Sequence, residues 1–420
     1  MSSMNRMKTS SEFLGEYQNV HMNVFGTPLR VMEHGEGCRI WDVDGKEYLD
    51  FLAGIAVNAL GYAHKTWTEA ISRQAAKLAH VSNYFATPGQ IELACKLLRL
   101  AETPEGSRVY FCNSGTEANE AALKLARLHG HALANKKTEP ARIIALTHGF
   151  HGRTLGSLSA TWKPAIRNAF EPLIPGIEFV EASDEDDIKR AFDESDKRGP
   201  VSAVILELIQ GEAGVLPVGA EYSRCVRKLC DDFGALMIID EVQTGIGRTG
   251  AWFAFQREDL SGGITPDAIT FAKGAGSGFP IGGLITFGNK VSSLFTPGSH
   301  GSTFAGNPLA AAAGLATIEA IESENLIDNA EKRGIQLREG ISGLSNPLFE
   351  SVRGQGLLNA IVLTKPCAHA AMQWALEHGL IINAPSPDVL RLAPPLIVSE
   401  EEMNEAIKIL SSMPEYLEQD

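Results

Sequence analysis

The sequence predicts an α/β fold, in which a large domain with a mostly parallel sheet flanked by helices is joined to a smaller α+β domain. Three observations predict this fold. Helical patterns alternate with short β-branched runs between about residues 66 and 315. These runs lack strict polar–apolar alternation, as expected for strands that helices cover on both faces. The length of 420 residues allows about two or three domains of roughly 150 residues each.

The first elements follow from local patterns, taken in chain order. Residues 38–50 (CRIWDVDGKEYLD) predict a hairpin, because two short alternating runs flank Asp44-Gly45. The strands of the large domain then come from β-branched and apolar runs. These strands are Arg108–Cys112, Arg142–Leu146, Ala203–Leu208, Leu236–Ile239 and Ala268–Phe271.

From about residue 316 the chain has a different pattern. A helix over Ala368–His378 precedes two short strands, Leu380–Asn383 and Val389–Leu392. Ser399 and Glu402 match a capping box that opens a final amphipathic helix. We therefore expect residues 1–65 to join the small domain, residues 66–315 to form the large domain, and residues 316–420 to complete the small α+β domain.

Composition and charge restrict the function. The 37 Lys and Arg against 51 Asp and Glu give a net charge of −14, which opposes nucleic acid and anionic membrane partners. No apolar run approaches the ~18–20 residues of a membrane span. The six scattered cysteines show no zinc spacing, and the N-terminal segment shows no signal-peptide core. We expect a cytoplasmic protein without a metal, in which any anionic ligand meets locally concentrated positive charge.

Polar residues follow the first two strands of the large domain. Ser114-Gly115-Thr116 open a helix, so they offer free amides and a positive dipole end to a phosphate, or serve only as an N-cap. Phe150 could stack on a planar ring and Arg153 could bind a carboxylate, or the two could belong to a surface turn with one core phenylalanine. His148 and His151 lack a third ligand, so no metal site is predicted.

Two later strands are also followed by ionisable groups. Asp240 comes at the end of an apolar strand, where a carboxylate needs cations or donors. Lys273 follows the next strand and precedes a glycine-rich run, which suits a Schiff-base amine beside a large ligand. The alternative is a buried ion pair between Asp240 and Lys273.

Together these residue types match the needs of pyridoxal phosphate. That cofactor requires a lysine for its aldehyde, an acid for its ring nitrogen, a phosphate cup and an aromatic residue against its ring. The rival motifs fail, because the glycines at 274, 276 and 278 do not form GxGxxG and no GxxxxGK[ST] is present.

Five blocks in order resemble the class III (ω-) aminotransferases of fold type I, and the resemblance runs from about residue 22 to 412. The blocks are LIQGEAGV (208–215), IIDEVQTGIGRTG (238–250), ITFAKGAGSGFPIGG (269–283), HGSTFAGNP (300–308) and VLRLAPPLI (389–397). The resemblance implies pyridoxal phosphate as cofactor. The implied contacts are Lys273 with the aldehyde, Asp240 with the pyridine nitrogen, Gln243 with the phenolic oxygen, Ser114, Gly115 and Thr116 with the phosphate, and Phe150 on the ring.

The resemblance also implies a partner and a substrate site. Thr303 reaches the phosphate of the neighbouring subunit in this family, which implies an obligate homodimer. Arg153 and Arg391 match family positions that bind the two carboxylates of glutamate and 2-oxoglutarate. Glu212 matches the carboxylate that pairs with the second arginine while an ω-amino substrate is bound. The alternative for Arg391 and Glu212 is a permanent ion pair.

Within the class, residues 51–64 and 381–399 are similar to the acetylornithine aminotransferases, which implies transfer of an amine from N2-acetyl-L-ornithine to 2-oxoglutarate in arginine biosynthesis. Gly54 stands where ornithine aminotransferases carry an aromatic residue, and its small size leaves room for an N-acyl group. Tyr62 and Lys65 depart from the usual His and Pro. The alternatives are ornithine, succinylornithine, succinyldiaminopimelate or 4-aminobutyrate as substrate, a mutase or decarboxylase reaction, and a non-catalytic cofactor-binding regulator.

Overall fold

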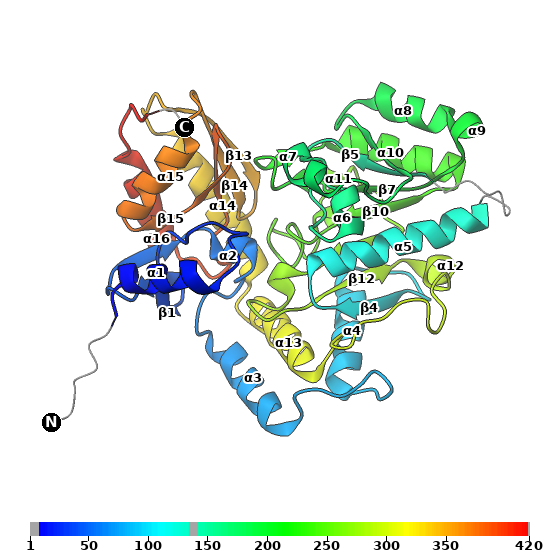
Figure 1. Ribbon diagram of the computed structural model, residues 1–420, viewed down its shortest axis with the longest axis horizontal. Coiled ribbons are helices and arrows are strands. Elements are labelled where there is room, and N and C mark those ends of the chain that lie inside the picture. The colour runs from blue at the N-terminus through cyan, green and yellow to red at the C-terminus, as the bar shows by residue number, and fades with distance from the viewer. Residues whose placement is uncertain (1–7, 134–141, 419–420) are drawn as a thin grey trace.

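The computed structural model describes residues 8–133 and 142–418. The start of the predicted N-terminal segment, residues 1–7, lies outside the described residues. The central sheet has seven strands, and helices cover both of its faces (Figure 1). Its order is β4 (Arg108–Cys112), β12 (Gly282–Thr286), β11 (Ala268–Phe271), β10 (Leu236–Asp240), β7 (Val201–Leu206), β5 (Arg142–Leu146) and β6 (Ile177–Val180). Within the described residues, β12 runs antiparallel to both of its neighbours and the other neighbouring strands of this sheet run parallel, so the predicted α/β fold with a mostly parallel sheet is confirmed.

Apolar residues on both faces of each strand explain why the strands show no polar–apolar alternation. On β7, Ala203 and Ile205 belong to a core cluster with helix α5 (Gly115–Leu133) on one face. Val204 and Leu206 belong to the second cluster, with α10 (Ala220–Phe233), on the other face. A parallel sheet buried on both sides needs this composition.

Three small sheets accompany the central one. One has the order β1 (Met32–Glu36), β2 (Arg39–Asp42), β3 (Glu47–Asp50) and β15 (Leu380–Ile381). Another has the order β13 (Phe349–Gln355), β14 (Leu358–Leu363), β17 (Val389–Leu392) and β16 (Asn383–Ser386). A two-stranded ribbon joins β8 (Ile209–Gln210) to β9 (Leu216–Pro217). The predicted hairpin is present as β2 and β3. The predicted strand over 380–383 divides, because its two parts pair in different sheets.

The helices complete the layers. The remaining helices are α1 (Ser10–Val20), α2 (Ala53–Ala56), α3 (Lys65–Lys77), α4 (Pro88–Leu100), α6 (Leu155–Ser159), α7 (Pro164–Arg167), α8 (Glu185–Asp193), α9 (Ser195–Arg198), α11 (Glu258–Ser261), α12 (Gly288–Ser292), α13 (Pro308–Ser323), α14 (Leu326–Ser342), α15 (Ala368–Glu377) and α16 (Glu400–Ser411). The capping box of Ser399 and Glu402 is present at the start of α16. Within the described ranges, no helix has the length and apolar character needed to cross a membrane.

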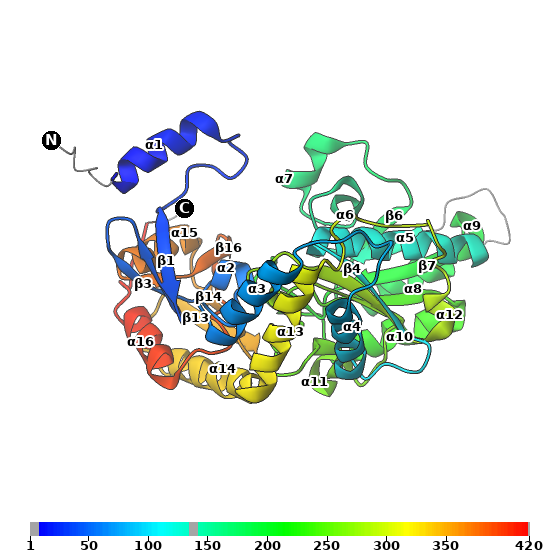
Figure 2. The same cartoon turned by 90° about the horizontal axis from the view of Figure 1, so that it is seen from below.

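Segments from the two ends of the chain meet in one body, beside the body that contains the central sheet (Figures 1 and 2). β3 near the N-terminus pairs in parallel with β15 near the C-terminus. Helix α13 lies between the two bodies and packs against α3, α4 and α14. The division of the chain at residues 65 and 315 stays a prediction.

Candidate active site

A cavity of about 430 Å³ lies where strands of the central sheet end. Nine of the residues singled out in the sequence line it, from segments far apart in the chain. They are Ser114, Gly115, Thr116, Phe150, Arg153, Glu212, Asp240, Gln243 and Lys273. The convergence follows from topology, because parallel strands end at the same edge of a sheet.

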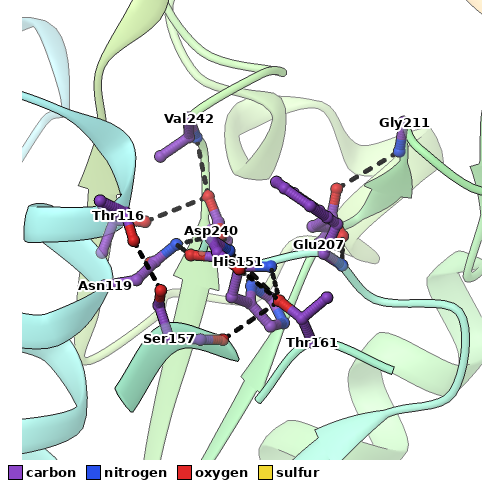
Figure 3. Close-up of polar contacts among 12 residues, drawn as sticks. Thr116, Asn119, His151, Ser157, Thr161, Glu207, Gly211, Asp240 and Val242 are labelled. Atoms are coloured by element: carbon purple, nitrogen blue, oxygen red, sulfur yellow. Dashed lines mark hydrogen bonds and ion pairs between the residues drawn. The ribbon is translucent and has the colours of Figure 1, made fainter. Parts of the chain in front are cut away.

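Asp240 ends β10 and lines the cavity, and both oxygens of its carboxylate have polar partners (Figure 3). Its Oδ2 lies 2.7 Å from His151 Nδ1 and accepts a 2.7 Å hydrogen bond from Asn119 Nδ2. Its Oδ1 accepts from the Val242 amide at 3.0 Å and from the Thr270 hydroxyl at 3.2 Å. Burial opposes ionisation, but the hydrogen bond and charge of His151 hold the pKa of Asp240 below its usual range. Asp240 is therefore a buried, ionised carboxylate.

His151 also lines the cavity, and from the sequence it was considered only as a metal ligand. Burial opposes its protonation, yet the hydrogen bond and charge of Asp240 raise its pKa above the usual value. The ion partner of Asp240 is thus His151, and among the described residues no ion pair joins Asp240 to Lys273. The buried Asp240–Lys273 pair considered above is not present.

Lys273 follows β11 after one intervening residue, Ala272, and has a φ of +43°. A non-glycine residue in this left-handed region is uncommon and clusters at functional sites. Burial lowers the pKa of its amine below the usual value. A desolvated amine with a lowered pKa is more often neutral, which makes it a better nucleophile and base.

The N-terminus of α5 faces the same cavity. The amides of Gly115 and Thr116 lie in the first helical turn, so no earlier carbonyl of the helix is available to accept hydrogen bonds from them. A Cβ at Gly115 would lie 2.6 Å from Cγ1 of Val242, so this position has no room for a side chain. The Thr116 hydroxyl accepts from the Arg153 amide at 3.2 Å and lies 2.6 Å from the Ser157 hydroxyl. This end of the cavity can hold an anion.

Arg391 lies behind the cavity, 1% exposed, and contacts two residues that line it. Its Nη1 donates to Glu212 Oε1 at 2.6 Å and to Gln243 Oε1 at 3.2 Å. Burial opposes ionisation of Glu212, but the charges of Arg391 and Lys273 lower its pKa below the usual value. The second terminal nitrogen of Arg391, Nη2, is buried without a hydrogen-bond partner among the described residues. Arg391 therefore keeps an unused donor beside the cavity.

Arg153 is exposed, and its guanidinium lies 5.9 Å from the centre of the Phe150 ring. Within residues 8–133 and 142–418 it has no ion pair, unlike Arg391. Thr303 is exposed and does not line the cavity of its own chain. Gly54 has a φ of +63° and also lies off the cavity lining, to which Val57 contributes instead.

Glu207 is a second residue that the sequence analysis missed, because it was assigned to the interior of a strand. The strand ends one residue earlier, and Glu207 lines the cavity. Its carboxylate accepts from the Phe150 amide at 2.8 Å and from the Gly211 amide at 3.3 Å (Figure 3). Burial raises its pKa to about 7. The sequence does contain a signal for this residue, because Glu207 is acidic within the otherwise apolar run Ala203–Leu208.

Replacing Glu241 with glutamine is expected to change how stability depends on pH. The carboxylate is buried and accepts from the amides of Ala254 and Phe255. Its pKa rises from 4.5 to about 7 because of burial, so the folded protein retains a proton that the unfolded chain releases. The free energy of unfolding therefore falls as pH rises through this window, and Glu241→Gln removes that contribution.

Urea unfolding at several pH values measures this effect. The stability of the wild type relative to the variant should decrease from pH ~4.5 to ~7 and then stay constant. A difference that is independent of pH would show that Glu241 is ionised in the folded protein throughout the window.

Comparisons with known proteins identify the family of the chain. The sequence profile of the family Aminotransferase class-III matches residues 21–413. An acetylornithine aminotransferase of Bifidobacterium longum is 65% identical over 98% of this chain and 97% of the relative. The crystal structure of an acetylornithine aminotransferase from Elizabethkingia anophelis is 32% identical, with a TM-score of 0.83 over 96% of this chain and 98% of that one. An ornithine aminotransferase from Toxoplasma gondii is 30% identical, with a TM-score of 0.89 over 97% and 95% of the two chains.

The chain therefore belongs to the class III aminotransferases, which are pyridoxal-phosphate-dependent enzymes. The residues present fit that cofactor. An ionised buried carboxylate suits a protonated ring nitrogen, a desolvated lysine suits an aldehyde, and a helix N-terminus suits a phosphate. Asn119 Oδ1, which is buried without a partner among the described residues, leaves further hydrogen-bonding capacity at the cavity.

Proposed function

We propose that the chain transfers the δ-amine of N2-acetyl-L-ornithine to 2-oxoglutarate, which gives N-acetyl-L-glutamate 5-semialdehyde and L-glutamate in arginine biosynthesis. The observation that carries the proposal is a pair of arginines in different states, of which Arg153 lines the cavity and Arg391 contacts two residues of its lining. Arg153 is free of ion pairs in the described structure, whereas Arg391 is bound to Glu212. The name of the 65% identical relative supports the choice of substrate.

The two arginines suit two substrates of different charge. Arg153 is placed to bind the carboxylate that each substrate presents at the mouth of the cavity. Glutamate carries a second carboxylate, and for this substrate Glu212 turns away so that Arg391 can bind it. With acetylornithine, Glu212 stays on Arg391 and neutralises it. The carboxylate thus works as a gate on the second arginine.

The reaction steps assign a task to each residue of this chain. When bound, pyridoxal phosphate supplies an electrophilic aldehyde and an electron sink. Lys273 Nζ is the amine that would hold the aldehyde of the cofactor, and as a free base it would carry the proton from the substrate carbon. Asp240, held by His151 and Asn119, keeps a proton on the ring nitrogen. The amides of Gly115 and Thr116 and the Ser114 hydroxyl would hold the phosphate, Phe150 would cover the ring, and Gln243 would contact the phenolic oxygen.

We also propose a cytoplasmic homodimer in which Thr303 binds the phosphate of the partner subunit. The exposed side chains around Thr303 support an interface. Phe304 is 58% exposed, while Tyr84 and Phe85 are 93% and 66% exposed. Asn83 donates to the Ala305 carbonyl at 3.0 Å, which places these segments side by side. Aromatic side chains exposed in one patch are typical of a surface that a partner covers.

Gly54 is proposed to leave space for the N-acyl group of the substrate.

The proposed function is tested by kcat/KM for acetylornithine, succinylornithine, ornithine and 4-aminobutyrate, each with 2-oxoglutarate. We expect acetylornithine to give the highest value, because only a site open to an N-acyl group accepts it well. Succinylornithine extends the acyl group by one methylene and a carboxylate, and a single methylene changes kcat/KM by about 10-fold to 200-fold. A higher value for ornithine or 4-aminobutyrate would overturn the substrate assignment. A protein that binds pyridoxal phosphate but transfers no amine would instead favour the non-catalytic regulator, and a protein that binds no pyridoxal phosphate would exclude the aminotransferase.

A further inference from the structure

We infer that Arg353 is a positioning residue for the Glu212 gate: it holds the backbone of the loop that carries Glu212, so that only the side chain moves when the enzyme changes substrate. This inference rests on the proposed function of Glu212. Arg353 lies on β13, outside the cavity lining, and no motif in the sequence singled it out.

Arg353 contacts the gate loop through its backbone. Glu212 lies in residues 211–215, which connect β8 to β9. Arg353 donates to the Gly214 carbonyl through Nε at 3.0 Å and Nη2 at 2.7 Å, and Nε also lies 3.2 Å from the Val215 carbonyl. It has no ion pair among the residues that the structure describes. Its hydrogen-bonding capacity is therefore directed at this loop.

The sheet register places Arg353 and Arg391 in one row. Arg353 is opposite Ala360 on β14, and Ala360 is opposite Arg391 on β17. Residues directly opposite in antiparallel strands point to the same face of the sheet. The small side chain of Ala360 separates the two guanidinium groups, which bind the Gly211 and Gly214 carbonyls at the two ends of the loop.

The loop backbone is held in a conformation that requires such support. Val215 is fully buried with a φ of +58°, and a β-branched residue in this region is a genuine outlier. Gly214 has a φ of +96°, and a Cβ there would lie 3.2 Å from Nη2 of Arg353. Glu207 holds the other side of the loop through the Gly211 amide (Figure 3). Strained backbone of this kind persists only where its surroundings fix it.

Fixing the loop matters most for the ω-amino substrate. In that half-reaction Glu212 must stay on Arg391, at the 2.6 Å separation seen here. In the glutamate half-reaction Glu212 must leave Arg391, so loop order contributes less. Loss of the Arg353 clamp should therefore weaken the two half-reactions unequally.

The test compares Arg353→Gln, Arg353→Lys and the control Arg338→Gln in the holoenzyme. Arg338 is the control, because it is an arginine that donates to the Gly356 carbonyl at 3.5 Å and to Asn359 Oδ1 at 2.9 Å but does not contact residues 211–215 in the described structure. For Arg353→Gln, single-turnover kcat/KM with acetylornithine should fall about tenfold, while the value with glutamate changes less than about twofold. For Arg353→Lys, kcat/KM with acetylornithine should fall less than for Arg353→Gln. Hydrogen exchange of the peptide that contains residues 211–215 should accelerate only in the Arg353 variants.

Equal losses in both half-reactions, or unchanged exchange in the loop, would overturn the role of Arg353. A wild-type enzyme that rejects acetylornithine would instead overturn the proposed function. In that case the role of Arg353 is still decided by comparing the losses in the two half-reactions, with ornithine or 4-aminobutyrate as the ω-amino substrate.

Discussion

Replacing Lys273 with alanine is expected to abolish transamination, with kcat reduced by about 10⁴-fold or more. Lys273 has two tasks in the proposed reaction, as the amine that holds the cofactor and as the base that carries the substrate proton. Its desolvated amine, with a lowered pKa, is suited to both. No other lysine lines the cavity in the described structure, so no neighbouring side chain can replace it. Steady-state kinetics with either amino donor measures the loss.

Two controls separate chemistry from folding in this experiment. Lys65→Ala removes an exposed lysine, 87% exposed at its side chain, and should leave kcat unchanged. Adding a small primary amine to the Lys273 variant should recover part of the proton-transfer rate, because the space left by the side chain can admit it. Borohydride should attach the cofactor covalently to the Lys273 peptide of the wild type. A Lys273→Ala enzyme within tenfold of the wild type would exclude the proposed role.

The residues proposed to bind the cofactor could be predicted from the sequence because of a rule of topology. Strands that run parallel all end at one edge, so Ser114, Asp240 and Lys273 were expected together once each was seen to follow a strand. No knowledge of which strands pair was needed. The structure places all three around one cavity.

Contacts that depend on register or on close packing could not be predicted in this way. His151 and Asp240 are 89 positions apart, and no local pattern specifies that their side chains meet. Arg353 and Arg391 share a row only because β13, β14 and β17 pair as they do. Strand β12 was missed because it begins with two glycines, which have low strand propensity. Gly283 is required there, since a Cβ would lie 2.3 Å from the Tyr110 carbonyl oxygen.

Replacing Asp240 with asparagine is expected to lower kcat about 10³-fold in both half-reactions, which corresponds to roughly 4 kcal/mol of transition-state stabilisation. The change keeps the shape of the side chain but removes the charge that holds a proton on the ring nitrogen. It also leaves His151 buried without its ionised partner. The loss should appear equally with acetylornithine and glutamate, because Asp240 serves the cofactor rather than either substrate.

The role of His151 makes this prediction specific to the Asp240 network. His151→Gln removes the positive charge that lowers the pKa of Asp240, so that pKa should rise and the acid limb of the kcat profile should move to higher pH. His148→Asn is the matched control, because His148 lies three positions away, is exposed and has a φ of +64° that asparagine tolerates. Its profile should match that of the wild type. If His151→Gln lowers kcat without moving the acid limb, then His151 supports the fold of the site but does not keep Asp240 ionised.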